Sequence, residues 1–175
     1  EFEVVRLQEI GRDATEALEE AMLDIDNDES EIEVAGEIAK ELWGRNLEPV
    51  VLLVAGEDRI KKYRHPLPTT SQVGNLVMGV ICARRKGLIA SVTRLVHFGS
   101  LTSEVEDKYL KLLNVEAAFL DATEPGATFA EVFKAGQLEY LKQGFDRDEW
   151  TNHHQGGPTG YLPREFTAHE KTNQV

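Results

Sequence analysis

Two β-rich runs joined by a short charged connection are the feature that most restricts the fold of this chain. Leu76 to Ala83 and Leu88 to Phe98 are the two runs, and Arg84-Arg85-Lys86-Gly87 joins them. A short connection that contains glycine between two such runs is typical of a β-hairpin. We therefore predict an antiparallel pair of strands whose turn lies near Lys86 and Gly87.

Apolar residues recur at spacings of three and four in four other segments, and this spacing predicts amphipathic helices. These segments run from residues 4 to 23, 32 to about 44, 102 or 103 to about 123, and 129 to about 144. Pro49 to Val54 is predicted as a buried strand. The order of these predicted elements suggests a duplicated unit, in which each copy has two helices followed by sheet. The second copy reaches the start of a strand and stops before its own hairpin.

The third predicted helix has an apolar face, which we expect to point inward. Its members are Val105, Tyr109, Leu112, Leu113, Ala117 and Leu120. The segment after the fourth helix, from Trp150 to Phe166, is rich in glycine, histidine and proline and has no helical period. We therefore expect it to contain a pocket rim rather than another helix.

Charge and cysteine content exclude several classes of function. The chain has 19 Lys and Arg against 31 Asp and Glu, a formal charge of −12, and so lacks the basic surface that binding to nucleic acid requires. A single cysteine, Cys82, excludes an internal disulfide framework and favours a cytoplasmic location. The apolar runs are too short for a membrane helix. We expect one domain over residues 1–175, cut from a longer protein.

Four short strings of the sequence carry a resemblance to other proteins. They are Tyr63-Arg64-His65-Pro66-Leu67-Pro68-Thr69, Gly87 to Gly99, Glu124-Pro125-Gly126-Ala127-Thr128, and His153-His154-Gln155-Gly156-Gly157-Pro158-Thr159-Gly160-Tyr161. In this order the chain resembles the catalytic domain of methionine aminopeptidase, prolidase, aminopeptidase P and creatinase. The resemblance implies an α+β pita-bread fold, in which helix pairs and antiparallel sheet form two related halves. The second half is expected to be truncated here.

The same resemblance implies a dinuclear metal centre held by two Asp, one His and two Glu. Counted from Arg94, the two Asp positions fall at Ser91 and Val80, and the ligand His, three residues before Gly160, falls at Gly157. The two Glu positions lie beyond the last residue of this sequence. Valine has no donor atom, and a neutral serine hydroxyl does not supply the charge of a bridging carboxylate. We therefore expect no metal and no other cofactor.

Two histidines fall where the superfamily keeps histidines that handle substrate without binding metal, namely His65 and His153. A later substrate-side histidine of the family aligns with Arg164, which Glu165 follows. The resemblance therefore implies catalytic roles for His65, His153 and Glu165. Creatinase is the informative comparison within this superfamily, since it hydrolyses its substrate without metal and uses a histidine as the acid and base. We also expect Arg94, Arg164 and Tyr161 to contact substrate.

Several of these residues have a simpler interpretation. His65 fits an exposed turn as well as an active site, and Arg94 fits an ion pair better than a clamp for a substrate carboxylate. His153 and His154 are adjacent, and on a strand their side chains would point to opposite faces, so we do not expect them to bind one metal ion together. Cys82 is expected to be an inert core thiol.

The function that follows is that of a prolidase-like or aminopeptidase P-like protein without the dinuclear centre. It would either hydrolyse a small C–N bonded substrate, as creatinase does, or have no catalytic activity. The alternative is a peptide- or protein-binding module, as the large subunit of the FACT histone chaperone is in the same superfamily. The expected partners are a small molecule or peptide and a second copy of the chain, since an open strand edge favours a homodimer.

Overall fold

The computed structural model describes residues 2–175, and these form two compact units. The first unit contains the chain up to Ser100 together with Thr159–Glu165. The second contains Leu101–Pro158 and Phe166–Val175. Segments distant in sequence therefore meet in each unit.

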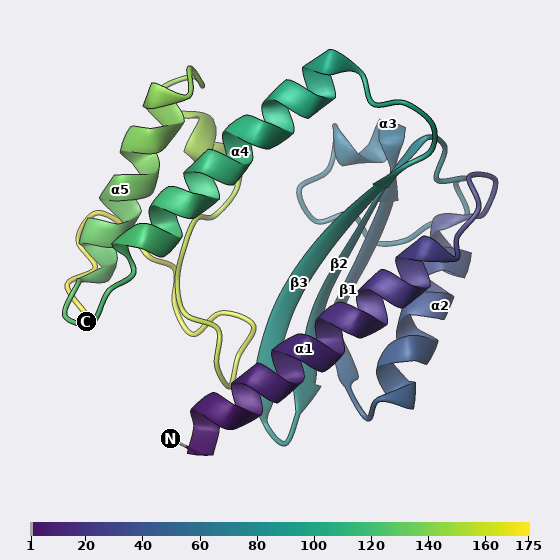
Figure 1. Ribbon diagram of the computed structural model, residues 1–175, viewed down its shortest axis with the longest axis horizontal. Coiled ribbons are helices and arrows are strands. Elements are labelled where there is room, and N and C mark those ends of the chain that lie inside the picture. The colour runs from purple at the N-terminus through teal and green to yellow at the C-terminus, as the bar shows by residue number, and fades with distance from the viewer. Residues whose placement is uncertain (1) are drawn as a thin grey trace. The chain divides into compact units, whose positions relative to one another are not determined.

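The first unit is an antiparallel sheet of three strands with two helices on one face. Figure 1 shows α1 (Phe2–Leu23) lying diagonally across the sheet, with α2 (Glu31–Gly44) beside it. The strands β1 (Glu48–Gly56), β2 (Leu76–Arg85) and β3 (Leu88–His97) have the order β1-β2-β3, and a short helix α3 (Glu57–Ile60) follows β1. The apolar spacing of the sequence does not predict α3, which is short and mostly charged.

The predicted hairpin is confirmed. Lys86 and Gly87 both have positive φ, +53° and +88°, which is the backbone of a two-residue turn that matches the twist of the flanking strands. β2 and β3 pair in one unbroken register from Leu76 opposite His97 to Arg85 opposite Leu88. This register fixes which residues of the two strands share a face.

The helices begin at side chains that cap them. Ser30 accepts a hydrogen bond from the backbone N–H of Glu33, and Glu33 bonds back to Ser30, so α2 starts with a capping box. Thr128 and Glu131 form the same box at the start of α5 (Phe129–Lys142), and Thr102 caps α4 (Ser103–Ala122). All four predicted helices are confirmed, with bounds within a few residues of those expected.

The hydrophobic core of the first unit lies between the sheet and its two helices. Gly79 is needed there because a Cβ at this position would lie 2.9 Å from the sulfur of Met22 and 3.2 Å from Leu18. Burial of this apolar surface is the main stabilising term of the unit. The fully buried members include Ala14, Leu18, Met22, Val34, Ile38, Leu42, Val54, Val77, Ile81 and Ala83.

The second unit pairs α4 with α5 and adds a short 3₁₀ helix, η1 (Glu149–Asn152). Phe133 of α5 packs edge-to-face on Trp150, and the tail returns to the start of α5, where Thr172 and Gln174 accept hydrogen bonds from Ala130 and Phe129. The described residues after α5 contain no strand, so the strand expected there is not formed.

The predicted inner face of α4 is wrong. Val115 is the buried residue of this helix, whereas Tyr109, Leu112 and Leu113 are each nearly half exposed and Leu120 is 65% exposed. The apolar spacing correctly indicated a helix, but α4 contacts α5 through a different face. Among the described residues, no helix combines the length and apolar character needed to cross a membrane.

Candidate functional site

The two sheet positions where the superfamily keeps metal-binding aspartates share one face of the sheet. Gly79 and Ile81 point toward α1 and α2, so Val80 between them points to the other face, because side chains alternate along a strand. Ser91 lies opposite Cys82 in the β2–β3 register, and Val80 lies opposite Thr93. Val80 and Ser91 are therefore diagonal neighbours on what we call the second face, the face that α1 and α2 do not cover.

These side chains do not fit the family's metal centre. Val80 offers no donor atom, and the hydroxyl of Ser91 donates a hydrogen bond to the sulfur of Cys82 at 3.3 Å. The third position, Gly157, has no side chain to bind with and has a φ of +100°. Three of the five ligand positions therefore hold residues that cannot replace an anionic or imidazole ligand of a divalent ion.

His65 lies on an exposed loop that a buried carboxylate organises. Glu31 is fully buried at the first position of α2. Its Oε2 accepts hydrogen bonds from the backbone N–H and the hydroxyl of Thr69, at 2.9 and 2.7 Å, and its Oε1 accepts one from the N–H of Gly56 at 2.9 Å. One side chain thus ties the loop to both α2 and the end of β1.

Arg59 of α3 completes this arrangement. Its Nε lies 3.0 Å from Oε1 of Glu31, its Nη2 donates to the carbonyl of Leu67 at 2.8 Å, and its guanidinium stacks over the ring of Tyr63 at 4.8 Å. The loop segment that contains His65 is therefore held on both sides by one ion pair, in which Glu31 is fully buried and Arg59 is half-buried. Neither Glu31 nor Arg59 could be predicted from the sequence, because a charged residue at the start of a helix gives no sign that it will be buried and paired with a residue of another helix.

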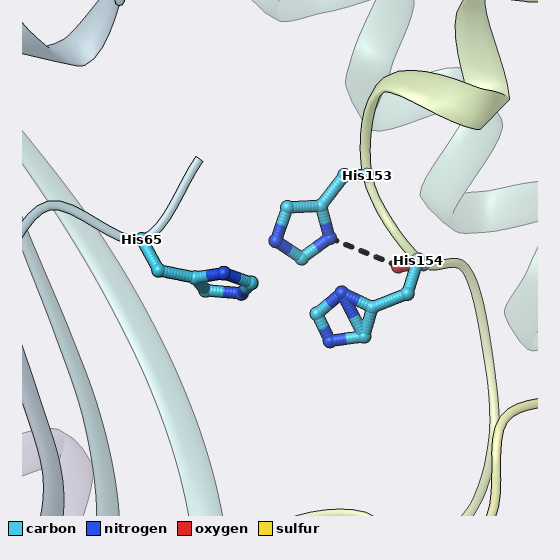
Figure 2. A group of neighbouring side chains, drawn as sticks. All are labelled: His65, His153 and His154. Carbon is cyan, nitrogen blue, oxygen red and sulfur yellow. Dashed lines mark hydrogen bonds between the residues drawn. The ribbon is translucent and has the colours of Figure 1, made fainter. Parts of the chain in front are cut away.

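His153 and His154 follow η1 in the second unit. Figure 2 shows their imidazoles side by side; the ring centroids are 4.0 Å apart and the planes differ by 27°. Nδ1 of His153 donates to the carbonyl oxygen of His154 at 2.9 Å, which leaves Nε2 of a neutral ring as its lone-pair nitrogen. The expectation that the two side chains diverge is wrong, because the segment is a loop and not a strand. His65, drawn in the same figure, belongs to the first unit.

A cavity of about 550 Å³ lies beside this histidine loop within the second unit. His154 and Gly157 contribute to its wall, and the rest is largely aromatic and aliphatic. Gln155 supports the loop, since its amide nitrogen lies 3.2 Å from the carbonyl of His153 and its oxygen accepts from the hydroxyl of Tyr140 at 3.3 Å. Burial raises the pKa of Tyr140, so its hydroxyl stays protonated.

The remaining predicted site residues of the loop at 159–165 belong to the first unit. The carbonyl of Gly160 accepts from the N–H of Ile89 at 2.8 Å, which attaches the loop to the start of β3. Oε1 of Glu165 accepts the backbone N–H groups of Tyr161 and Leu162, at 2.6 and 3.0 Å, so this carboxylate holds the loop together. The hydroxyl of Tyr161 donates to Glu3.

The two predicted substrate-binding arginines have different surroundings. Arg94 pairs with Glu19 of α1, with Nη2 and Oε1 2.8 Å apart, so its charge is already matched on the helical side of the sheet. Arg164 is half-buried, and among residues 2–175 its Nε is shielded from solvent without a hydrogen-bond acceptor. Of the two arginines, Arg164 therefore has the more unusual surroundings.

Solved structures establish the fold. The prolidase from Pyrococcus horikoshii OT3 matches with a TM-score of 0.89 at 20% identity, over 100% of this chain and 51% of that protein. The X-Pro aminopeptidase from Thermotoga maritima MSB8 matches with a TM-score of 0.83 at 16% identity, over 98% and 49%. The Xaa-Pro dipeptidase from Bacillus anthracis matches with a TM-score of 0.84 at 18% identity, over 100% and 50%.

These matches define the class of protein: an α+β chain with the pita-bread fold of the Xaa-Pro peptidases, spanning about half the length of the structures it resembles. The sequence matches metallopeptidase family M24 over residues 5–170, and the chain belongs to this family. A search of curated proteins gives no significant match.

Proposed function

We propose that this chain is an Xaa-Pro peptidase-like protein that works without the dinuclear metal centre of its family and hydrolyses a small C–N bonded substrate. The observation on which this rests is the pair of diagonal neighbours Val80 and Ser91. They occupy adjacent places on the second face of the sheet, as two metal-binding carboxylates would, and they supply no carboxylate. The position is therefore retained while the ligand chemistry is replaced.

The proposed acid and base is His65, and His153 and Glu165 are the further catalytic candidates. A histidine takes the proton of an attacking water as the oxygen bonds to the carbonyl or amidine carbon. The same proton then passes to the leaving nitrogen as the C–N bond breaks, so acid and base are regenerated. The roles of these residues rest on their positions in the family pattern. The support from the structure is the rigid attachment of the His65 loop to Glu31 and Arg59.

The experiment combines metal analysis with turnover. We expect chelator-free protein to contain well below stoichiometric Mn, Co or Zn, and hydrolysis of Xaa-Pro dipeptides or creatine-like amidines to be unchanged by added Mn²⁺. His65→Ala should lower turnover by about 10²–10⁴-fold, with little change in stability, because general acid–base catalysis typically contributes that factor. His97→Ala, which removes a histidine on β3, is the matched control and should retain activity.

Near-stoichiometric metal, or activity that requires Mn²⁺, would contradict the proposal, as would full activity in His65→Ala. If no amide, amidine or Xaa-Pro substrate is cleaved, the peptide-binding alternative replaces it. That alternative predicts saturable binding of proline-containing peptides without turnover. Calorimetric titration with an uncleaved peptide separates the two functions, since it detects binding whether or not a bond is broken.

A further inference from the structure

Three phenylalanine rings line the cavity of the second unit. Phe119 comes from α4, Phe129 and Phe133 come from α5, and the loop after η1 contributes His154 and Gly157. The volume of about 550 Å³ lies within the range of sites that bind small molecules, and a mostly apolar wall with a few polar groups is typical of them. None of the proposed catalytic groups lines this cavity. It is therefore a candidate binding site in its own right.

Each of the three rings is held in place by a contact with a residue that does not line the cavity. The two rings of α5 pack edge-to-face on Phe166 and on Trp150, with centroids 4.9 and 5.3 Å apart. The ring of Phe119 lies against the backbone of α5 at Gly136, where a Cβ would be only 2.0 to 2.5 Å from its atoms. Because these rings are fixed from outside, a ligand would not have to order them, which lowers the entropic cost of binding.

The loop that forms another part of the wall is also fixed. The side-chain amide nitrogen of Gln155 lies 3.2 Å from the carbonyl of His153 and 3.4 Å from that of Trp150. Gly156 has a φ of +62°, and a Cβ there would lie 3.3 Å from the Cβ of Ala168, so the loop runs directly against the returning tail. The cavity is therefore preformed on the loop side as well as on the helix side.

The charge of the wall indicates the charge of the ligand. Glu116 of α4 is the one acidic residue among the lining residues, which include no lysine or arginine. Glu116 has no ion pair among residues 2–175, whereas Lys108 and Lys111 of the same helix are paired with other carboxylates at 3.0 and 2.7 Å. The face of an aromatic ring also attracts a cation, because the π-electrons give it a negative potential. The rings and the carboxylate therefore favour the same ligand charge.

We propose that this cavity binds a small organic cation with an apolar body, such as an alkyl- or aryl-substituted ammonium ion. The phenylalanine rings contact the apolar body and attract the positive charge, and Glu116 supplies the opposite charge. A neutral ligand of the same shape would gain the apolar contacts alone, and an anion would be repelled by the carboxylate. The inference does not depend on the proposed hydrolysis, since the lining residues and the proposed catalytic groups are different side chains.

The test compares two soluble probes of the same shape, 3-hydroxyphenyltrimethylammonium and 3-tert-butylphenol, in which carbon replaces the charged nitrogen. Calorimetric titration of the 175-residue chain should show the cation binding about 10-fold more tightly than the phenol. In Glu116→Gln this preference should fall to about 3-fold, since the rings remain but the carboxylate is lost. Glu106→Gln is the matched control, because it removes an exposed glutamate of α4 that does not line the cavity, and it should keep the full preference.

Removal of a ring and the location of the bound probe give two further measurements. Phe119→Leu should lower the affinity for the cation about 5-fold, whereas Tyr109→Leu, which removes an exposed ring of α4 outside the cavity, should not change it. Amide NMR spectra of the unmodified chain should show shift changes at Gly156 and Gly157 when the cation is added.

Four results would each overturn the inference. They are equal binding of the two probes, no binding of the cation, a preference that Glu116→Gln leaves unchanged, and shift changes confined to the first unit. The Glu116→Gln result does not depend on the stability of Phe119→Leu, because an exposed glutamate is replaced by a residue of the same size.

Discussion

Glu31 shows how a single buried side chain determines the conformation of a loop far away in sequence. Its carboxylate is fully buried and bonds to Gly56, Thr69 and Arg59, three residues on three different segments. Within the first unit these contacts fix the loop that contains His65. Glu31 and Arg59 act through the position of His65 and not by contact with a substrate, so both are positioning residues.

Replacing Glu31 should therefore destabilise the protein strongly. Glu31→Ala leaves the donors of Thr69 and Gly56 unpaired and Arg59 without its counter-ion, so we expect a loss of about 3 kcal/mol or more in the free energy of unfolding. Glu31→Gln keeps the shape but loses the charge, so its loss should be smaller. Glu37→Gln, which removes an exposed partner of Lys40 on the same helix, is the control and should change stability by less than about 1 kcal/mol. Urea unfolding measures all three, and an unchanged midpoint in Glu31→Ala would contradict this account.

At the scale of elements, capping residues define where the helices begin. The boxes Ser30–Glu33 and Thr128–Glu131 are local devices, each complete within four residues. Hydrogen bonds from the backbone N–H and the hydroxyl of Thr128 lower the pKa of Glu131, and those of Ser30 lower the pKa of Glu33. Folding thus favours the ionised form of both glutamates.

This shift predicts a dependence of stability on pH. Since the pKa of Glu131 is lower in the folded state than its usual value of 4.5, its contribution is fully present above that value and is lost as the pH falls through the folded pKa. Glu131→Gln can still form the box but does not titrate. The unmodified chain should therefore be more stable than Glu131→Gln at pH 6, and the difference should shrink at pH 3. In a Thr128→Ala background the pH dependence of this difference should largely disappear; if it persists, the box is not its cause.

Two helical glycines give a second prediction at this scale. A Cβ at Gly136 of α5 would lie 2.0 to 2.5 Å from ring atoms of Phe119 on α4, whereas a Cβ at Gly36 of α2 meets nothing within 4 Å. Gly36→Ala should stabilise the chain by up to about 1 kcal/mol through helix propensity. Gly136→Ala should lose about 1–3 kcal/mol, since the ring of Phe119 has to move. Thermal unfolding of both variants compares them directly, and equal stabilisation would show that the helices have room to adjust.

At the scale of the whole molecule, exposed apolar side chains and edge strands favour association of the chain with a second chain. β1 and β3 are both edge strands of the sheet, and the second unit exposes Tyr109, Leu110, Leu112, Leu113, Leu120, Leu138 and Leu141. Exposed apolar residues gathered on one helix pair are typical of a surface that contacts another protein. The homodimer expected from the sequence therefore stays a prediction, and the exposed apolar side chains of α4 and α5 are the surface through which we expect it to form.

Analytical ultracentrifugation should detect a concentration-dependent dimer or larger assembly. Leu113→Glu combined with Leu120→Glu should shift the equilibrium toward monomer, because both side chains are exposed on α4 and charge there opposes apolar contact. Leu23→Glu, at an 80% exposed position at the end of α1, is the control and should leave association unchanged. A monomer at all concentrations would contradict the prediction.

Features that depend on near neighbours in the chain follow from the amino-acid sequence alone. Apolar spacing and the turn at Lys86 and Gly87 act over a few residues, so the helices and the hairpin could be predicted from them, and the caps at Ser30, Thr102 and Thr128 are equally local. Four short strings also identify the family, and spacing from Arg94 is the basis on which Val80 and Ser91 are expected at its metal-binding positions. The register of β2 and β3 shows in addition that these two residues share a face of the sheet.

Burial and pairing of side chains, in contrast, depend on how the whole chain folds. Glu31 and Thr69 are 38 residues apart, and no local pattern shows that this glutamate loses all contact with solvent. The exposed apolar face of α4, the stacked rings of His153 and His154, and the shielding of Nε of Arg164 from solvent also depend on contacts that sequence spacing does not encode. The physical reason is that propensity and capping are local free energies, whereas desolvation depends on every segment that the fold brings against a side chain.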